Sequence, residues 1–418
     1  MKISACLITK NESANIARCL ESIPKTVDEI IVADTGSTDD TVSIAESYGA
    51  RVFHYEWDNN FSSAKNYALG KASGDWIIFL DADEYLNINT QNILHDTLKK
   101  IHSNKSFDAI YSIMINTDGY NGKIISKNIT VRIFRNNGIR YTGAIHEQLH
   151  KNGHPFKCVR VKNKDLVIYH TGYALGNLAN KFSRNLALLE DQERSGHINE
   201  LTYYYLSSSY SNLGNQELAV KYALLALKEL KLKETPVAFK PYVFLITGML
   251  SLIDQYTFEE IEKYVREALD LYPNHPELWR LDARLKKAEN KYHQAIKSYL
   301  QALDCHQNFN QTMDNIFYIY LEEVYCDLGY LSNLTGVTLD AVEYYYQALK
   351  TNKYSVKAFT SLYDMIKGQK VGEIVFFLNT IYNKEDEKDL TFLCKVLINL
   401  NEQAAGYYYN LWDIKFNK

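Results

Sequence analysis

The feature that most constrains this chain is a change in hydrophobic periodicity between Gly172 and Gly176. Before it, short apolar runs alternate with amphipathic segments, as in the strands and helices of a mostly parallel sheet. After it, apolar residues recur only at helical spacing. The pattern predicts an α/β domain over residues 1–175 and an all-α domain over residues 176–418. A chain of 418 residues is long enough for two such cores.

Polar residues follow the ends of several predicted strands. The expected strands are Ile3–Thr9, Glu29–Ala33, Arg51–Tyr55 and Trp76–Leu80, and the expected helices run through Leu20, from Thr38 through Tyr48, and from Phe61 to Leu69. In open α/β sheets, ligands bind outside the carboxyl ends of the strands. Clusters at residues 9–11, 34–37 and 81–83 all lie at such ends. We therefore expect them to share one ligand site.

The second domain carries small and aromatic residues at offsets typical of tetratricopeptide (TPR) repeats. Ala268 and Ala302 are 34 residues apart, which is the period of that repeat. Other residues at repeat positions are Tyr203, Leu206, Tyr210, Gly214, Ala219, Tyr222, Ala226, Trp279, Ala283, Ala295, Tyr299, Ala341, Tyr345 and Ala348. The many tyrosines are expected to pack between helices rather than to contact a ligand.

Composition excludes several classes of function. The net charge of -4 and pI near 6.3 argue against wrapping nucleic acid, which calls for a basic surface. No signal peptide is expected at the start, and the apolar stretch Tyr242–Ile253 is too short for a membrane span. The six cysteines form no Cys-x-x-Cys pair, which favours reduced thiols and a cytoplasmic location.

The strongest local signal is Asp81-Ala82-Asp83, directly after an apolar strand. Carboxylates at positions i and i+2 of such a loop can point into one crevice, where their repulsion favours a bound cation. Mg²⁺ and Mn²⁺ prefer such oxygen ligands and bridge to substrate phosphates. The alternative is a strand-end turn with a helix cap.

Four segments in order resemble the family 2 glycosyltransferases of the GT-A fold. They are Leu7-Ile8-Thr9-Lys10-Asn11-Glu12, Val32-Ala33-Asp34-Thr35-Gly36-Ser37-Thr38-Asp39, Phe61-Ser62-Ser63-Ala64-Lys65-Asn66 and Trp76-Ile77-Ile78-Phe79-Leu80-Asp81-Ala82-Asp83-Glu84. The resemblance covers about residues 1–175. It implies an inverting transferase that uses a nucleotide-sugar, usually a UDP-sugar.

The resemblance also implies roles for particular residues. Thr9 and Asp34 would hold the nucleoside, and the Asp81–Asp83 loop would meet ribose, metal and diphosphate. The other donor-binding candidates in these segments are Asn11, Glu12, Lys65 and Ala82. Many family members carry a second acid where this chain has Thr35, so recognition of the base by a carboxylate is not expected there.

Three later segments narrow the resemblance. Arg132-Ile133-Phe134-Arg135-Asn136-Asn137-Gly138, Gly143-Ala144-Ile145-His146-Glu147 and Ile168-Tyr169-His170-Thr171-Gly172-Tyr173, followed by TPR-like helices, are similar to the peptide S-glycosyltransferases of glycocin (sublancin-type) bacteriocins. The same order also occurs in related enzymes whose acceptor is unassigned.

Glycosyl transfer needs a base near the acceptor and cationic help for the leaving diphosphate. Glu147 is the candidate base and His146 the alternative. Arg132, like Lys65, is a candidate for pairing with phosphate, although an exposed cation is more often only solvated. Glu147 has a structural alternative as well, in which it only closes a loop.

The predicted metal ligands are Asp83, His170 and Asp81, with Mg²⁺ or Mn²⁺ as the ion. A late histidine often supplies a third ligand in the GT-A fold. A lone histidine also often packs or caps an element, so that alternative stays open for His170.

Three functions compete at this stage. The first is a hexosyltransferase acting on a Cys or Ser side chain of a peptide such as a bacteriocin precursor, with the repeats gripping the acceptor or a second copy in a homodimer. The second changes the acceptor to a cell-surface polysaccharide or a lipid-linked sugar. The third is a repeat scaffold with a catalytically dead domain, against which intact Asp81, Asp83 and Glu147 argue.

Overall fold

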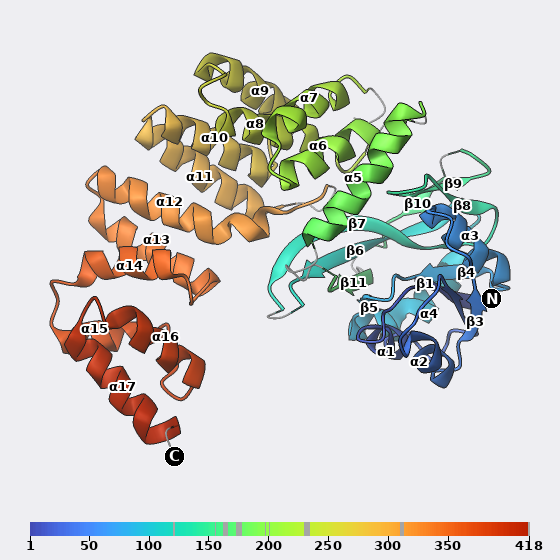
Figure 1. Cartoon of the computed structure of the whole chain (residues 1–418), viewed down its shortest axis with the longest axis horizontal. Coiled ribbons are helices and arrows are strands. Elements are labelled where there is room, and N and C mark those ends of the chain that lie inside the picture. Colours follow the sequence, from blue (N-terminus) through green and yellow to red (C-terminus); the bar gives the residue numbers. More distant parts are fainter. Residues whose placement is uncertain are drawn as a thin grey trace. The chain divides into compact units, whose positions relative to one another are not determined.

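The computed structural model describes residues 1–119, 122–154, 156–161, 166–172, 178–196, 198–199, 201–229, 235–309 and 313–416. The chain forms two compact units, Met1–Tyr256 with Asn310–Ile316, and Thr257–Phe309 with Phe317–Lys418 (Figure 1). The predicted boundary at residues 175 and 176 lies outside the described residues. The change from strands to helices falls inside the first unit, which continues through the described helices α5 to α8 of the predicted all-α region.

The first unit is built on a mixed sheet of nine strands in the described part of the chain. Its strand order is β3-β2-β1-β4-β7-β6-β11-β5, with β10 beside β6, while β8 and β9 form a separate hairpin. The neighbours β3, β2, β1 and β4 run parallel, whereas β7 is antiparallel to both β4 and β6. The strands are β1 Ile3–Thr9, β2 Glu29–Asp34, β3 Arg51–His54, β4 Trp76–Phe79, β5 Glu84–Leu86, β6 Ala109–Thr117, β7 Ile124–Arg135, β8 Ile139–Thr142, β9 Gln148–Lys151, β10 Cys158–Val159 and β11 Leu166–His170.

Alternation along the central strands sorts their side chains onto two faces. In β1, Ile3, Ala5 and Leu7 join one hydrophobic cluster, whereas Cys6 joins the other. The first cluster is covered by residues of α1, α2 and α4, and the second by residues of α3. These helices are α1 Ile16–Glu21, α2 Thr41–Ser47, α3 Phe61–Lys71 and α4 Ile88–His102. Because both faces are covered, the central strands read as continuous apolar runs, and the predicted α/β layering is confirmed.

The remaining described elements are helical. They are α5 Leu178–Arg194, α6 Thr202–Asn212, α7 Gln216–Ala226, α8 Lys240–Ser251, α9 Phe258–Leu271, α10 Pro276–Ala288, α11 Tyr292–Gln307, η3 Phe317–Tyr320, α12 Leu321–Leu334, α13 Thr338–Thr351, α14 Val356–Ile366, α15 Val371–Leu378, α16 Glu387–Leu397 and α17 Glu402–Phe416. Among the described residues, none of the helices is long and apolar enough to cross a bilayer.

Small residues lie where paired helices touch, as the repeat pattern predicts. Ala219 in α7, Ala302 in α11 and Ala348 in α13 are fully buried. A Cβ added to Gly329 of α12 would lie 2.8 Å from the Tyr345 ring of α13, so this pair of helices packs too closely for a larger side chain. The all-α repeat architecture predicted for the second half is therefore confirmed.

Candidate active site

The carboxyl ends of β1 and β2 form one side of the site. Thr9 and Asp34 are partners in the parallel register, and the Thr9 hydroxyl lies 3.4 Å from the Asp34 carboxylate. The backbone N–H groups of Gly36 and Ser37 both donate to Asp34 at 3.1 Å. Burial would raise the pKa of Asp34, but these hydrogen bonds from Ser37 and Gly36 lower it. Asp34 is thus an ionised hydrogen-bond acceptor at a strand end, and it is one of the two residues for which the family resemblance implies binding of the nucleoside.

Asn11 and Glu12 lie on the loop after β1 and tie it to the loop after β2. The Asn11 backbone has a positive φ of 54°, and its side-chain oxygen accepts from the Thr38 N–H at 2.8 Å. The Glu12 carboxylate accepts from Asn15 at 2.9 Å. Burial raises the pKa of Glu12, with smaller contributions from nearby acids that include Asp83. The predicted donor-binding role of both residues stays a prediction.

Thr35 occupies the position where the family pattern often has a second acid. It is buried, and its hydroxyl donates to the Thr9 carbonyl at 3.0 Å. In this chain the side chain therefore joins β1 to β2.

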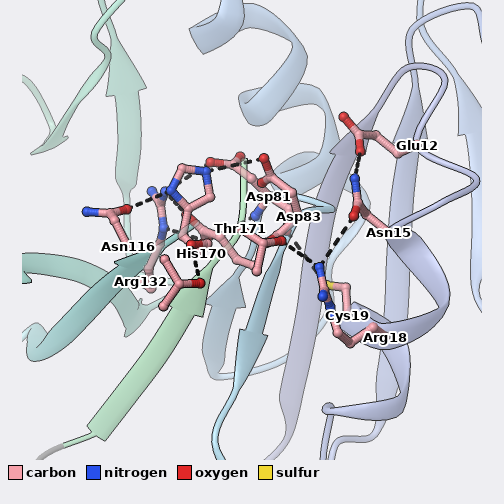
Figure 2. A network of polar contacts seen from close by, with 12 residues as sticks. Glu12, Asn15, Arg18, Cys19, Asp81, Asp83, Asn116, Arg132, His170 and Thr171 are labelled. Atoms are coloured by element: carbon pink, nitrogen blue, oxygen red, sulfur yellow. Dashed lines mark hydrogen bonds and ion pairs between the residues drawn. The ribbon is translucent and has the colours of Figure 1, made fainter. Parts of the chain in front are cut away.

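The two aspartates after β4 face different partners (Figure 2). One Asp81 oxygen lies 3.3 Å from the Lys65 ammonium, and the other accepts from the Arg132 guanidinium at 2.9 Å. Burial would raise the pKa of Asp81, but Lys65 and Arg132 lower it well below its usual range. Ala82 between the aspartates is buried, and Asp83 faces His170. The loop therefore directs one carboxylate to cations and the other to an imidazole.

Glu84 completes the charge arrangement beneath Asp81. Its buried carboxylate accepts from Arg132 at 2.5 and 3.0 Å, and from the Asp81 N–H at 3.2 Å. Burial raises the pKa of Glu84, while Glu84 and then Asp81 raise that of Arg132 against the effect of burial. Arg132 was predicted to pair with phosphate, and in the structure it clamps these two acids.

Lys65 on α3 joins the acid pair to the predicted base. Its buried ammonium forms ion pairs with both Asp81 and Glu147, and it lies over the rings of Phe79 and Tyr141. Burial would lower the pKa of Lys65, but Asp81 and Glu147 raise it. Lys65 is therefore a fixed cation between the two carboxylates.

The loop that carries Glu147 also touches a repeat helix. The His146 ring stacks on Tyr205 of α6, with ring centroids 3.4 Å apart and an interplanar angle of 3°. Tyr205 was expected only to pack between helices, and nothing in the sequence connects it to a loop 58 residues earlier. The stack places a helix of the repeat region next to the predicted catalytic residues.

His170, at the end of β11, is held between two polar partners. Its Nε2 lies 3.2 Å from an Asp83 oxygen and its Nδ1 lies 2.7 Å from Asn116 Oδ1. A Cβ added to Gly172 would fall 2.1 Å from the Asp83 carboxylate and 2.7 Å from His170 Nε2. The glycine therefore keeps open the space beside both groups. Sequence reasoning missed Asn116 altogether, whereas Gly172 stood within a segment already singled out.

This geometry fits a divalent ion on Asp83 and His170. A hydrogen bond on the far ring nitrogen, here to Asn116, is the usual way in which a metal-binding histidine is oriented. Across the described residues, His, Cys, Asp and Glu side chains form no group of three or more that could hold a metal ion. An ion at Asp83 and His170 would therefore take its other ligands from diphosphate and water. That Asp81 binds the ion directly stays a prediction, since both its oxygens face cations.

A further part of the network surrounds the backbone of Asp83. The Thr171 hydroxyl donates to the Asp83 carbonyl at 3.2 Å and accepts from Arg18 of α1 at 2.5 Å (Figure 2). The Cys19 thiol lies 3.7 Å from the Asp81 carbonyl. These contacts connect α1, the acid loop and the end of β11 in one site.

Comparison with known proteins finds similarity to glycosyltransferases and to a repeat protein. The sequence model described as glycosyl transferase family 2 matches residues 4–166. A TPR repeat-containing protein of Synechococcus elongatus is 36% identical over 147 residues, which are 35% of this chain and 35% of that protein. The SPbeta prophage-derived glycosyltransferase SunS of Bacillus subtilis is 31% identical over 236 residues, which are 55% of this chain and 54% of SunS.

A solved structure is also similar over a short stretch. Glucosyl-3-phosphoglycerate synthase from Mycobacterium tuberculosis, in complex with Mn²⁺, UDP and phosphoglyceric acid, is 30% identical, with coverage of 27% of this chain and 43% of that chain and a TM-score of 0.24. The chain spans about half or less of the length of the two curated relatives above. Residues 4–166, which match the glycosyl transferase family 2 model, carry the strand ends, the acid loop and the Glu147 loop.

Proposed function

We propose that this chain is an inverting, metal-dependent hexosyltransferase that uses a UDP-sugar and modifies a Cys or Ser side chain of a peptide. The family 2 domain supports sugar transfer. The similarity to SunS spans more residues than the family match, so it reaches beyond that domain. The peptide acceptor rests on the resemblance of the segments around Arg132, Glu147 and His170 to glycocin S-glycosyltransferases.

The observation that carries the proposal is the Lys65 bridge. One buried ammonium pairs with Asp81, at the predicted donor site, and with Glu147, the predicted base. The two ends of a displacement reaction are thereby held at a fixed separation, which lowers the entropy lost in bringing donor and acceptor together.

The reaction then follows from these positions. The acceptor oxygen or sulfur forms a bond to the anomeric carbon as the bond to the diphosphate breaks. Glu147 takes the acceptor proton, and Asp34 and Thr9 hold the nucleoside. A divalent ion held by Asp83 and His170 would neutralise charge on the leaving diphosphate.

The test is a transfer assay with the full chain. UDP-, GDP- and TDP-hexoses are offered with Mg²⁺ or Mn²⁺ and matched Ser and Cys peptides, and the products are weighed by mass spectrometry. We expect a peptide one hexose heavier, from the UDP-sugar, only with metal. Asp83→Asn should lower the rate about 100-fold or more. Asp96→Asn is the matched control, because that side chain is 79% exposed on α4.

Other outcomes would redirect the proposal. Full turnover in the presence of a chelator would contradict the proposed metal requirement. Donor hydrolysis without peptide modification would favour a polysaccharide or lipid-linked acceptor, and no donor turnover at all would favour a scaffold. We place the reaction in the cytoplasm because all six cysteines are free thiols. The homodimer stays a prediction. Measuring the molecular mass of the same preparation in solution tests it.

A further inference from the structure

We propose that Tyr205, on the repeat helix α6, is a positioning residue for Glu147. The inference rests on the proposed function, because it concerns how the proposed base is held. It assigns to the first repeat helices a part in the transfer step itself, beyond gripping an acceptor.

The Glu147 loop is fixed on one side by α3. The Phe61 N–H donates to the Ala144 carbonyl at 2.9 Å, and the Ser62 hydroxyl donates to the Gly143 carbonyl at 2.6 Å. Glu147 itself pairs with Lys65 of the same helix. These contacts hold the start of the loop and its last side chain, but they leave residues 145 and 146 to other partners.

Those two residues are held by the repeat helices. Ile145 is 4% exposed and belongs to a hydrophobic cluster with Leu189 of α5 and Leu206 of α6. The His146 ring lies flat against Tyr205 at 3.4 Å. Ile145 and His146 are therefore both packed against helices outside the region that matches the family 2 model.

The backbone explains why this support matters for Glu147. His146 has a φ of 51°, in the left-handed region that non-glycine residues adopt only when their surroundings hold them there. Glu147 is the next residue, so a relaxation at His146 would turn its carboxylate away from Lys65. The stack on Tyr205 fixes the ring of the strained residue and with it the direction of the following side chain.

The test compares substitutions that keep or remove the stack. Tyr205→Phe retains the ring and should keep kcat within about twofold, whereas Tyr205→Leu should lower kcat by about 10- to 100-fold, as expected for a catalytic group displaced by a fraction of an ångström or more. KM for the UDP-sugar should change less than kcat, because Tyr205 stacks on His146 and the pairing of Lys65 with Asp81 is retained. Tyr210→Leu is the comparison on the same helix, since it removes a stack with Tyr222 and a hydrogen bond to Glu190 but leaves the ring contact with His146 in place.

A second readout does not require activity. The backbone amides of residues 143–147 should exchange with deuterium faster in Tyr205→Leu than in the wild type, while those of β1 stay protected. The double variant Tyr205→Leu with His146→Ala should have a kcat only slightly below that of Tyr205→Leu alone, because both substitutions remove the same contact.

The inference and the proposed function fail in different ways. A wild-type chain that transfers no sugar contradicts the function. Transfer with unchanged kcat and unchanged loop exchange in Tyr205→Leu overturns the positioning role. Equal losses in Tyr205→Leu and Tyr210→Leu also overturn it, because they would show a general effect of helix packing.

Discussion

Arg132 lies between Asp81 and Glu84, two acids that would otherwise repel each other inside the protein. Its guanidinium donates to both, and Glu84 is almost completely buried. A planar, always-charged group suits this position because it can satisfy two carboxylates at once. The stability of the acid loop thus depends on a cation that also borders the donor site.

Replacing Arg132 with Met should destabilise the fold by about 3 kcal/mol at pH 7, because it leaves buried carboxylates without a main partner. The pKa of Glu84 is already raised by burial, and loss of Arg132 would raise it further. The penalty applies while Glu84 is ionised and falls as the pH drops through that raised pKa. The deficit should therefore be smaller at pH 5 than at pH 7.

Urea unfolding at both pH values measures the deficit of Arg132→Met. Arg51→Met provides the comparison, since its side chain is 59% exposed beside Glu29 and should change stability by less than about 1 kcal/mol. A deficit that grows toward pH 5 would contradict the role given to Glu84.

The prediction that Glu147 is the catalytic base also concerns a single residue. A Ser hydroxyl needs a base as it attacks, whereas a Cys thiol of reference pKa about 8.5 already supplies some thiolate near neutrality. Glu147→Gln should therefore reduce transfer to Ser peptides far more than transfer to Cys peptides, and a higher pH should partly restore the Cys reaction. Paired kinetics on the two peptides decide it. Small, equal losses would make Glu147 structural and leave His146 to be tested.

At the level of elements, the site depends on how β11 ends beside the acid loop. The β11 strand pairs with β5, which follows Asp83, and Gly172 is the second residue after the end of β11. Only a residue without a side chain fits there, because an added Cβ would collide with the Asp83 carboxylate.

Gly172→Ala should leave a folded protein with transfer lowered about 100-fold, because Asp83 and His170 must move apart from their present contact. Gly70→Ala in α3 is a fair control, since its added Cβ meets nothing within 4 Å. Circular dichroism checks the fold, and the dependence of rate on Mn²⁺ concentration checks the site. Normal rates at ordinary Mn²⁺ concentrations would contradict the placement of the ion.

Elements with a strong periodic pattern were predictable from the sequence. Strand β1 has the predicted bounds, because its run is buried on both faces and ends at a polar cluster. The partners of individual side chains were not predictable. Periodicity assigns a residue to a face, but it does not indicate that Lys65 lies between Asp81 and Glu147. The antiparallel strand β7, which carries Arg132 into the sheet, likewise depends on pairing between distant segments.

For the whole molecule, the important feature is that the first unit takes in a short piece of chain from beyond α11. Asn315 pairs with Lys127 of β7 through two backbone hydrogen bonds, and Asp314 binds the Lys240 ammonium at 2.5 Å. Burial would lower the pKa of Lys240, but Asp314 raises it. This ion pair holds the segment that carries Asp314 and Asn315 against the first unit.

Asp314→Asn should destabilise the first unit by about 3 kcal/mol, because the buried Lys240 ammonium would lose the carboxylate that offsets its burial. The double variant Lys240→Met with Asp314→Leu should lose less than Asp314→Asn alone, since it removes both charges. Thermal unfolding of the three proteins gives the comparison. Equal stability of Asp314→Asn and the wild type would show that the pair contributes nothing.

The segment that carries Asp314 and Asn315 also has a consequence for the order in which the protein folds during synthesis. Synthesis proceeds from the N-terminus, so Asn315 leaves the ribosome only after α9, α10 and α11 have been produced. Until then, the two backbone hydrogen bonds between Lys127 and Asn315 and the ion pair between Lys240 and Asp314 cannot form. The first unit is therefore completed only after helices α9 to α11, which belong to the second unit, have been synthesised. Released chains ending at residue 256 should be cut by protease more readily within β7 than released chains ending at residue 320, and equal protection would show that the late segment is dispensable.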